Sequence, residues 1–175
     1  AHFTENAEPL LRVSILPRGM SLGATQQTMA ADRHIETQPE LEARLQVMMG
    51  GYAAESLLFG NISSGSENDL RVATEFAYRM VAHYGMSERV GPVYHEQRVE
   101  HPFLGQRLAT EAALSDETAH EIEQEARRLL GAAVEGAKAV IAKHRAALEG
   151  LVAALLERET LERSELEGIL AITPA

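Results

Sequence analysis

Apolar and polar residues alternate with the period of a β-strand near the start of the chain. Residues 11–16, LRVSIL, alternate and are rich in β-branched side chains, which predicts a strand. Residues 22–27, LGATQQ, are expected to pair back onto it as a short second strand. Pro17 follows the first strand and cannot donate a ladder hydrogen bond, which favours an edge position for that strand.

From residue 39 onward the apolar residues follow the period of a helix. The first helical stripe covers residues 39–60. The pair Gly50-Gly51 lies inside this stripe, and each glycine costs about 1 kcal/mol relative to alanine in a helix. We therefore expect either a kink at these glycines or another part of the backbone passing close to them.

Helical stripes also fill most of the second half of the chain. One stripe begins after Ser66 and stops at Gly85. A long Ala-rich stripe follows Ser115, a residue typical of helix N-caps, and two shorter stripes come after it, the last near Ser164. The predicted fold class is therefore mainly α with a small N-terminal β-sheet. With 175 residues the chain is long enough for one domain with its own core.

Composition and charge exclude several classes of function. The chain has 16 lysines and arginines against 26 acids, a formal net charge of −10, which argues against nucleic acid and anionic membranes as partners. It has no cysteine, so it forms no disulfide or thiolate metal site, and this is compatible with a reducing compartment. No stretch approaches the ~18 apolar residues of a membrane span. Because no initiator methionine is present, we expect the chain to be a piece of a longer protein.

The segment SGSENDL, residues 64–70, places two acids at the start of a predicted helix. Ser66 is a suitable N-cap, and acids in a first turn favour the positive end of the helix dipole. A cap thus explains Glu67 and Asp69 without any function. The chain contains no HExxH zinc motif, GxSxG elbow or P-loop. Four of its seven histidines stand alone in the sequence and are interpreted as surface or packed polar residues; they are His2, His34, His83 and His144.

Seven ordered segments that span almost the whole chain carry a likeness to a known family. They are VSILPRGMSLGATQQ, MMGGYAAESLLFG, SSGSENDLRVATEFAYRMV, YGMSERVGPV, FLG, SDETAHEIEQEARRLL and ERETLERSELEGIL. In this order they resemble the peptidase domain of FtsH-type AAA+ zinc metalloproteases. The resemblance implies a mainly helical peptidase domain over residues 1–175, which forms a hexameric ring below an ATPase ring.

The resemblance gives a second interpretation of Asp69. The matching segment of the family supplies the third zinc ligand, and Asp69 is the residue that aligns with it. The other two ligands and the general-base glutamate belong to an HExxH helix, which we expect upstream of Ala1 and absent from this chain. The chemistry implied is attack of a zinc-activated water on a peptide carbonyl. Glu55 matches an acid of the family segment GG-x-A-A-E-E; it is expected either to support the site or to be an ordinary helix-surface acid.

The resemblance also suggests where substrate binds. In such proteases an extended peptide adds to the edge of the active-site sheet through main-chain hydrogen bonds. The candidate edge strand consists of Arg12, Val13, Ser14, Ile15 and Leu16. The alternative is that these residues form a core strand without a role in substrate binding.

The parent protein implied by the resemblance is a membrane-anchored, ATP-dependent zinc endopeptidase that degrades unfolded and membrane proteins. Zn²⁺ would act in the peptidase domain, and ATP with Mg²⁺ in an ATPase domain upstream. The peptidase domain is expected as a homohexamer in a reducing soluble compartment, on the cytoplasmic side of a bacterial membrane. This chain alone should not hydrolyse peptides, because one carboxylate is not a zinc site. The alternative is a non-catalytic, ring-forming scaffold that has lost the HExxH motif, and the parent reading frame would distinguish the two.

Overall fold

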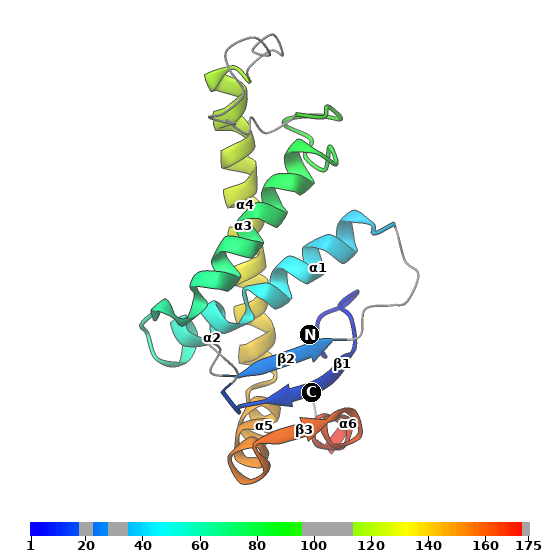
Figure 1. Cartoon of the computed structure of the whole chain (residues 1–175), viewed down its shortest axis with the longest axis vertical. Helices are drawn as coiled ribbons and strands as arrows, with labels where there is room; N and C mark the ends of the chain where they lie inside the picture. The colour runs from blue at the N-terminus through cyan, green and yellow to red at the C-terminus, as the bar shows by residue number, and fades with distance from the viewer. Residues whose placement is uncertain (18–22, 28–34, 96–113, 173–175) are drawn as a thin grey trace, which may run out of the picture.

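The structure is a computed structural model of the chain and describes residues 1–17, 23–27, 35–95 and 114–172. A long helix runs along the long axis of the molecule, other helices pack along its side, and a small sheet lies towards one end (Figure 1). In chain order the elements are β1 (Leu10–Ser14), β2 (Ala24–Gln27), α1 (Gln38–Met48), α2 (Gly50–Leu58), the 3₁₀ turn η1 (Ser64–Ser66), α3 (Glu67–Ala82), α4 (Asp116–Lys143), α5 (Arg145–Arg158), β3 (Thr160–Glu162) and α6 (Arg163–Ile172). The predicted fold class is confirmed.

The three strands form one antiparallel sheet in the order β2-β1-β3. The predicted pairing of the first two strands is confirmed, with Ser14 opposite Ala24. The third strand was not expected from the sequence. It pairs with β1 from Arg12 to Ser14, where Ser14 lies opposite Thr160 and the two hydroxyl oxygens are 2.8 Å apart. Segments almost at opposite ends of the chain therefore share one sheet.

The edge position predicted for Arg12, Val13, Ser14, Ile15 and Leu16 is wrong. The first three of these residues lie in the central strand and are paired on both sides. Beyond them, the Ile15 N–H donates to the carbonyl of Glu159 at 2.9 Å, and the Leu16 N–H donates to the Ser14 hydroxyl at 3.2 Å. Arg12, Val13 and Ser14 therefore form no edge of this sheet, whereas a role of residues 12–16 in substrate binding stays a prediction.

A first core cluster lies between α1, α3 and α4. Its largest fully buried side chains are Leu45, Met80 and Ile122, one from each helix. The facing surfaces of the helices are rich in small side chains; the buried alanines of α3 and α4 are Ala73, Ala77, Ala82, Ala126, Ala133 and Ala137. Because interaxial distance depends on the side chains at the contact, these alanines let the helices approach closely. The Ala-rich stripe predicted for the long helix is thus buried against other helices of the same chain.

The stripe predicted as one helix over residues 39–60 forms two helices, α1 and α2. Met49 separates them, with φ −81° and ψ 1°. The break falls directly before Gly50, which confirms the kink predicted at Gly50-Gly51. This break turns α2 away from the direction of α1 (Figure 1).

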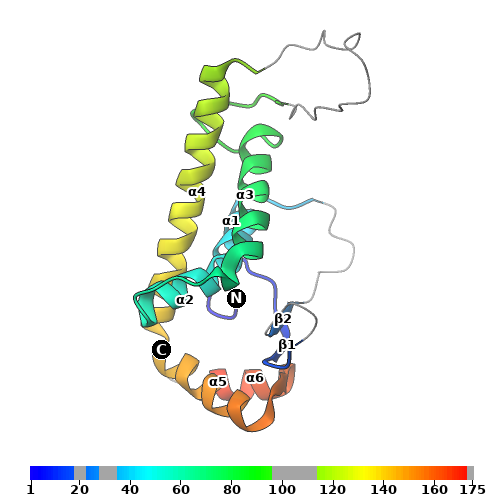
Figure 2. The same ribbon diagram turned by 60° about the vertical axis from the view of Figure 1, so that its left-hand side comes forward.

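A second core cluster joins the sheet to α5 and α6 at one end of α4 (Figure 2). Its buried side chains include Leu155 of α5, Leu161 of β3 and Leu166 of α6, and Val13 of β1 packs against them. The short strand β3 therefore contributes both ladder hydrogen bonds and a fully buried leucine. This explains how only three residues can hold the C-terminal helices against the sheet.

A buried polar contact ties the loop after α3 to the long helix. Glu125 of α4 is 8% exposed, and its Oε2 accepts hydrogen bonds from the Ser87 hydroxyl at 3.0 Å and from the Arg128 Nε at 3.1 Å. The Ser87 hydroxyl in turn accepts the N–H of Val90 at 3.3 Å. Burial of a carboxylate is tolerated where hydrogen bonds and a cation compensate it, as they do here.

Candidate metal centre

The segment SGSENDL forms the turn η1 and the first residues of α3. Ser63, directly before this segment, caps the turn, because its hydroxyl oxygen accepts the N–H of Gly65 at 3.1 Å. Helix α3 then starts at Glu67. The acids of the segment therefore lie in the first turn of α3, as the sequence predicts.

The hydroxyl of Ser66 does not cap α3, although Ser66 occupies the N-cap position. Its backbone has φ −87° and ψ 6°, whereas a capping residue usually has an extended backbone that aims its side chain at the first amides. The preceding 3₁₀ turn imposes this conformation. The Ser66 hydroxyl donates instead to the carbonyl of Ser63 at 3.3 Å. The capping role predicted for this side chain is therefore wrong.

Asp69 is an exposed acid in the first turn of α3. Among the described residues its carboxylate makes neither a hydrogen bond nor an ion pair. Its Oδ2 lies 4.0 Å from the position that a Cβ on Gly51 of α2 would take. The oxygen atoms of Asp69 are thus available to a cation, and the absence of a side chain at Gly51 leaves space beside them.

Glu55 of α2 is half-buried and engaged with both of its carboxylate oxygens. Its Oε2 accepts the N–H of Ser63 at 2.7 Å, and its Oε1 accepts the Ser63 hydroxyl at 2.8 Å. The backbone hydrogen bond first, and then the hydroxyl, hold the pKa of Glu55 below its ordinary value. With a depressed folded pKa, this stabilisation is present above the unfolded pKa and is lost as the pH falls through the folded pKa.

Asp69 is the one predicted metal ligand of this chain, and no complete metal site surrounds it. Within residues 1–17, 23–27, 35–95 and 114–172, no three histidine, aspartate or glutamate side chains are placed to hold one ion. Two of the described histidines have side-chain contacts elsewhere: His144 stacks on Phe3, and His120 lies 2.6 Å from the Gln124 amide nitrogen. A catalytic zinc ion takes three protein ligands, so Asp69 fits as one of them.

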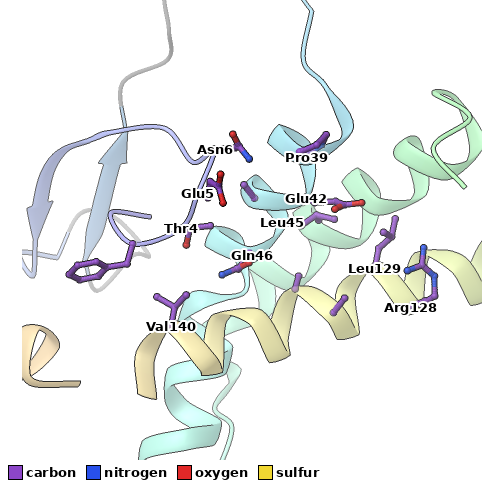
Figure 3. Close-up of a pocket in the computed structure, with 14 residues that line it drawn as sticks. Thr4, Glu5, Asn6, Pro39, Glu42, Leu45, Gln46, Arg128, Leu129 and Val140 are labelled. Atoms are coloured by element: carbon purple, nitrogen blue, oxygen red, sulfur yellow. The ribbon is translucent and has the colours of Figure 1, made fainter. Parts of the chain in front are cut away.

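A pocket of about 390 Å³ lies apart from Asp69, between the N-terminal segment, α1 and α4. Figure 3 shows polar side chains from these elements around it, among them Glu42, Gln46 and Arg128. Neither Asp69 nor Glu55 lines it. This pocket therefore does not coincide with Asp69, the metal ligand predicted from the sequence.

Comparison with known proteins shows to which family the chain belongs. The sequence model of peptidase family M41 matches residues 1–169, almost the whole chain. This chain belongs to peptidase family M41. Membership confirms the resemblance to FtsH-type zinc peptidase domains, and the mostly helical structure with its three-stranded sheet is the structure of such an M41 domain.

Curated M41 relatives are similar along this chain but are much longer. The ATP-dependent zinc metalloprotease FtsH of Syntrophotalea carbinolica is 42% identical over 99% of the chain, and FtsH 4 of Sphaerobacter thermophilus is 41% identical over 99%. FtsH of Nitrosococcus oceani is 42% identical over 93%. The chain spans about a quarter of the length of these relatives. No helix in the described part of the M41 chain has the length and apolar character needed to cross a membrane.

Proposed function

We propose that this chain is the peptidase domain, residues 1–175, of an ATP-dependent zinc endopeptidase that degrades unfolded and membrane proteins. The observation that carries the proposal is the carboxylate of Asp69. It is exposed and unpaired among the described residues, and it lies in the segment that resembles the third-ligand segment of the family. The relatives named above are ATP-dependent zinc metalloproteases, which supports the same chemistry.

In this proposal Asp69 supplies one oxygen ligand of the zinc ion. Two histidines and the general-base glutamate come from an HExxH segment upstream of Ala1 in the parent protein. A zinc ion held by these residues would supply an activated water molecule for attack on a peptide carbonyl. This chain contributes the negative charge of Asp69, the space beside it at Gly51 and the fold that holds both.

We also propose that an ATPase domain and a membrane anchor belong to the parent protein. The length of the relatives leaves room for both, and their names include ATP dependence. ATP and Mg²⁺ would act in that upstream domain, and the peptidase domain would lie on the cytoplasmic side of a bacterial membrane. The absence of cysteine is compatible with such a reducing compartment.

Removing the metal tests the proposed chemistry. In the full-length protein, a zinc chelator is expected to stop ATP-dependent degradation of an unfolded substrate such as casein, because the activated water is lost. Adding back zinc should restore degradation, while ATP hydrolysis continues throughout. The measurement is release of acid-soluble peptide, with ATPase activity as the control. Degradation that persists at full rate in the metal-free protein would exclude a zinc peptidase.

Assembly of the full-length protein into a homohexamer is a further part of the proposal. The buried alanines of α4 are covered within the chain, where α4 packs against α1, α2 and α3, so the contacts between subunits must use other surfaces. Light scattering of the full-length protein in detergent is expected to give six times the subunit mass, or a mass that rises towards it with concentration. A strict monomer at every concentration contradicts the proposal.

A further inference from the structure

We propose that Glu55 is a positioning residue for Asp69 and acts through Ser63, not as a ligand of the metal. The proposal rests on the proposed function only for the identity of the metal bound at Asp69. Both carboxylate oxygens of Glu55 are already engaged, at 2.7 Å with the Ser63 N–H and at 2.8 Å with the Ser63 hydroxyl. To bind a metal, Glu55 would have to release both hydrogen bonds.

Ser63 passes this restraint on to the turn that precedes α3. Its hydroxyl oxygen accepts the Gly65 N–H at 3.1 Å, and its carbonyl accepts the Ser66 hydroxyl at 3.3 Å. A Cβ on Gly65 would lie 3.1 Å from the Ser63 hydroxyl oxygen and 3.9 Å from Oε1 of Glu55, so the turn closes tightly around this contact. Four hydrogen bonds at Ser63 thus fix the backbone that leads directly into Glu67, the first residue of α3.

The position of Asp69 depends on this backbone. No hydrogen bond within the described residues holds its carboxylate, and the Ser66 side chain does not cap the helix. Besides the packing of α3 in the core, the turn that precedes α3 is therefore the contact that places its first turn. Glu55 and Gly51 are four residues apart on α2 and share one face of that helix. One face of α2 thus holds the turn through Glu55 and leaves space for the Asp69 carboxylate at Gly51.

The test measures zinc affinity of the full-length protein by competition with a chelator of known affinity. Glu55→Gln and Ser63→Ala should each weaken zinc binding by roughly 10- to 100-fold, the usual effect of losing a group that orients a metal ligand. Ser63→Thr retains the hydroxyl and should recover most of the loss. The matched control is Glu149→Gln, which neutralises an exposed glutamate paired with Arg145 on α5 and should leave affinity unchanged.

The comparison of Glu55→Gln with Ser63→Ala separates positioning from direct ligation. If Glu55 were itself a ligand, Glu55→Gln would remove zinc while Ser63→Ala left the affinity unchanged, and that pattern overturns the proposal. A general loss of folding is recognised from the melting temperature of the zinc-free form, which should stay close to that of the unmodified protein. A wild-type protein that binds no zinc refutes the proposed function but not the positioning contact.

Hydrogen exchange of the zinc-free protein tests, without any metal, whether the contact between Glu55 and Ser63 stabilises residues 63–69. The amides of residues 63–69 should exchange faster in Glu55→Gln and in Ser63→Ala than in the unmodified protein, because the turn loses its anchor. The body of α3 and the amides of α5 should be unaffected. Equal exchange rates over residues 63–69 in all variants would overturn the proposal whether or not the protein binds zinc.

Discussion

Shortening Leu45 to alanine is expected to lower the free energy of unfolding by about 2–5 kcal/mol. Leu45 is 1% exposed and lies in the core cluster that α1 forms with α3 and α4. The variant loses the transfer free energy of the buried side chain and leaves a cavity. Tightly packed helices rich in alanine have few long side chains that could move into that space, so relaxation should be limited.

Urea unfolding followed by circular dichroism measures this loss. The matched control is Leu156→Ala on α5, where the leucine is 74% exposed and the same atoms are removed. There we expect a change within about 0.5 kcal/mol, because a surface substitution creates no cavity. Similar losses in the two variants would show that Leu45 does not occupy a packed core position.

The helices could be predicted from the sequence because each carries its own signals. Ser115 illustrates this: its hydroxyl accepts the N–H of Thr118 at 3.1 Å, as the N-cap pattern predicts. The position of β1 could not be predicted in the same way. Its second partner, β3, has three residues, too few for a recognisable period, and lies almost 150 positions away. Pro17 was misleading because it follows the last paired residue, Ser14, and so affects no ladder hydrogen bond.

The candidate site was only partly accessible from the sequence. The local spacing predicted Asp69 as part of a helix cap, and the resemblance to a family predicted it as a zinc ligand. The segment SGSENDL is compatible with both interpretations. The backbone of Ser66, at ψ 6°, removes the support for a capping arrangement. The contact between Glu55 and Ser63 has no signal in the sequence, since it joins residues eight positions apart across a loop of no regular period.

Replacing Asp69 by asparagine is expected to remove bound zinc and reduce proteolysis by the full-length protein to background. A neutral amide is a poorer donor to a dication than a carboxylate, and the charge that balances zinc is lost. ATP hydrolysis should continue. Because the Asp69 carboxylate makes no hydrogen bond within the described residues, the zinc-free form should lose only its interaction with the helix dipole, about 0.3–1 kcal/mol. Alanine at this position should behave like asparagine.

The matched control for this prediction is Glu67→Gln. Glu67 is also an exposed acid in the first turn of α3, so its neutralisation removes a similar dipole interaction. We expect this variant to keep stoichiometric zinc and normal proteolysis, because Glu67 does not align with a family ligand. Zinc content, casein degradation and the melting temperature of the zinc-free form together separate the two acids. Full zinc and normal degradation in Asp69→Asn would mean that Asp69 is no ligand, and a large loss of zinc-free stability would mean that its carboxylate holds the helix.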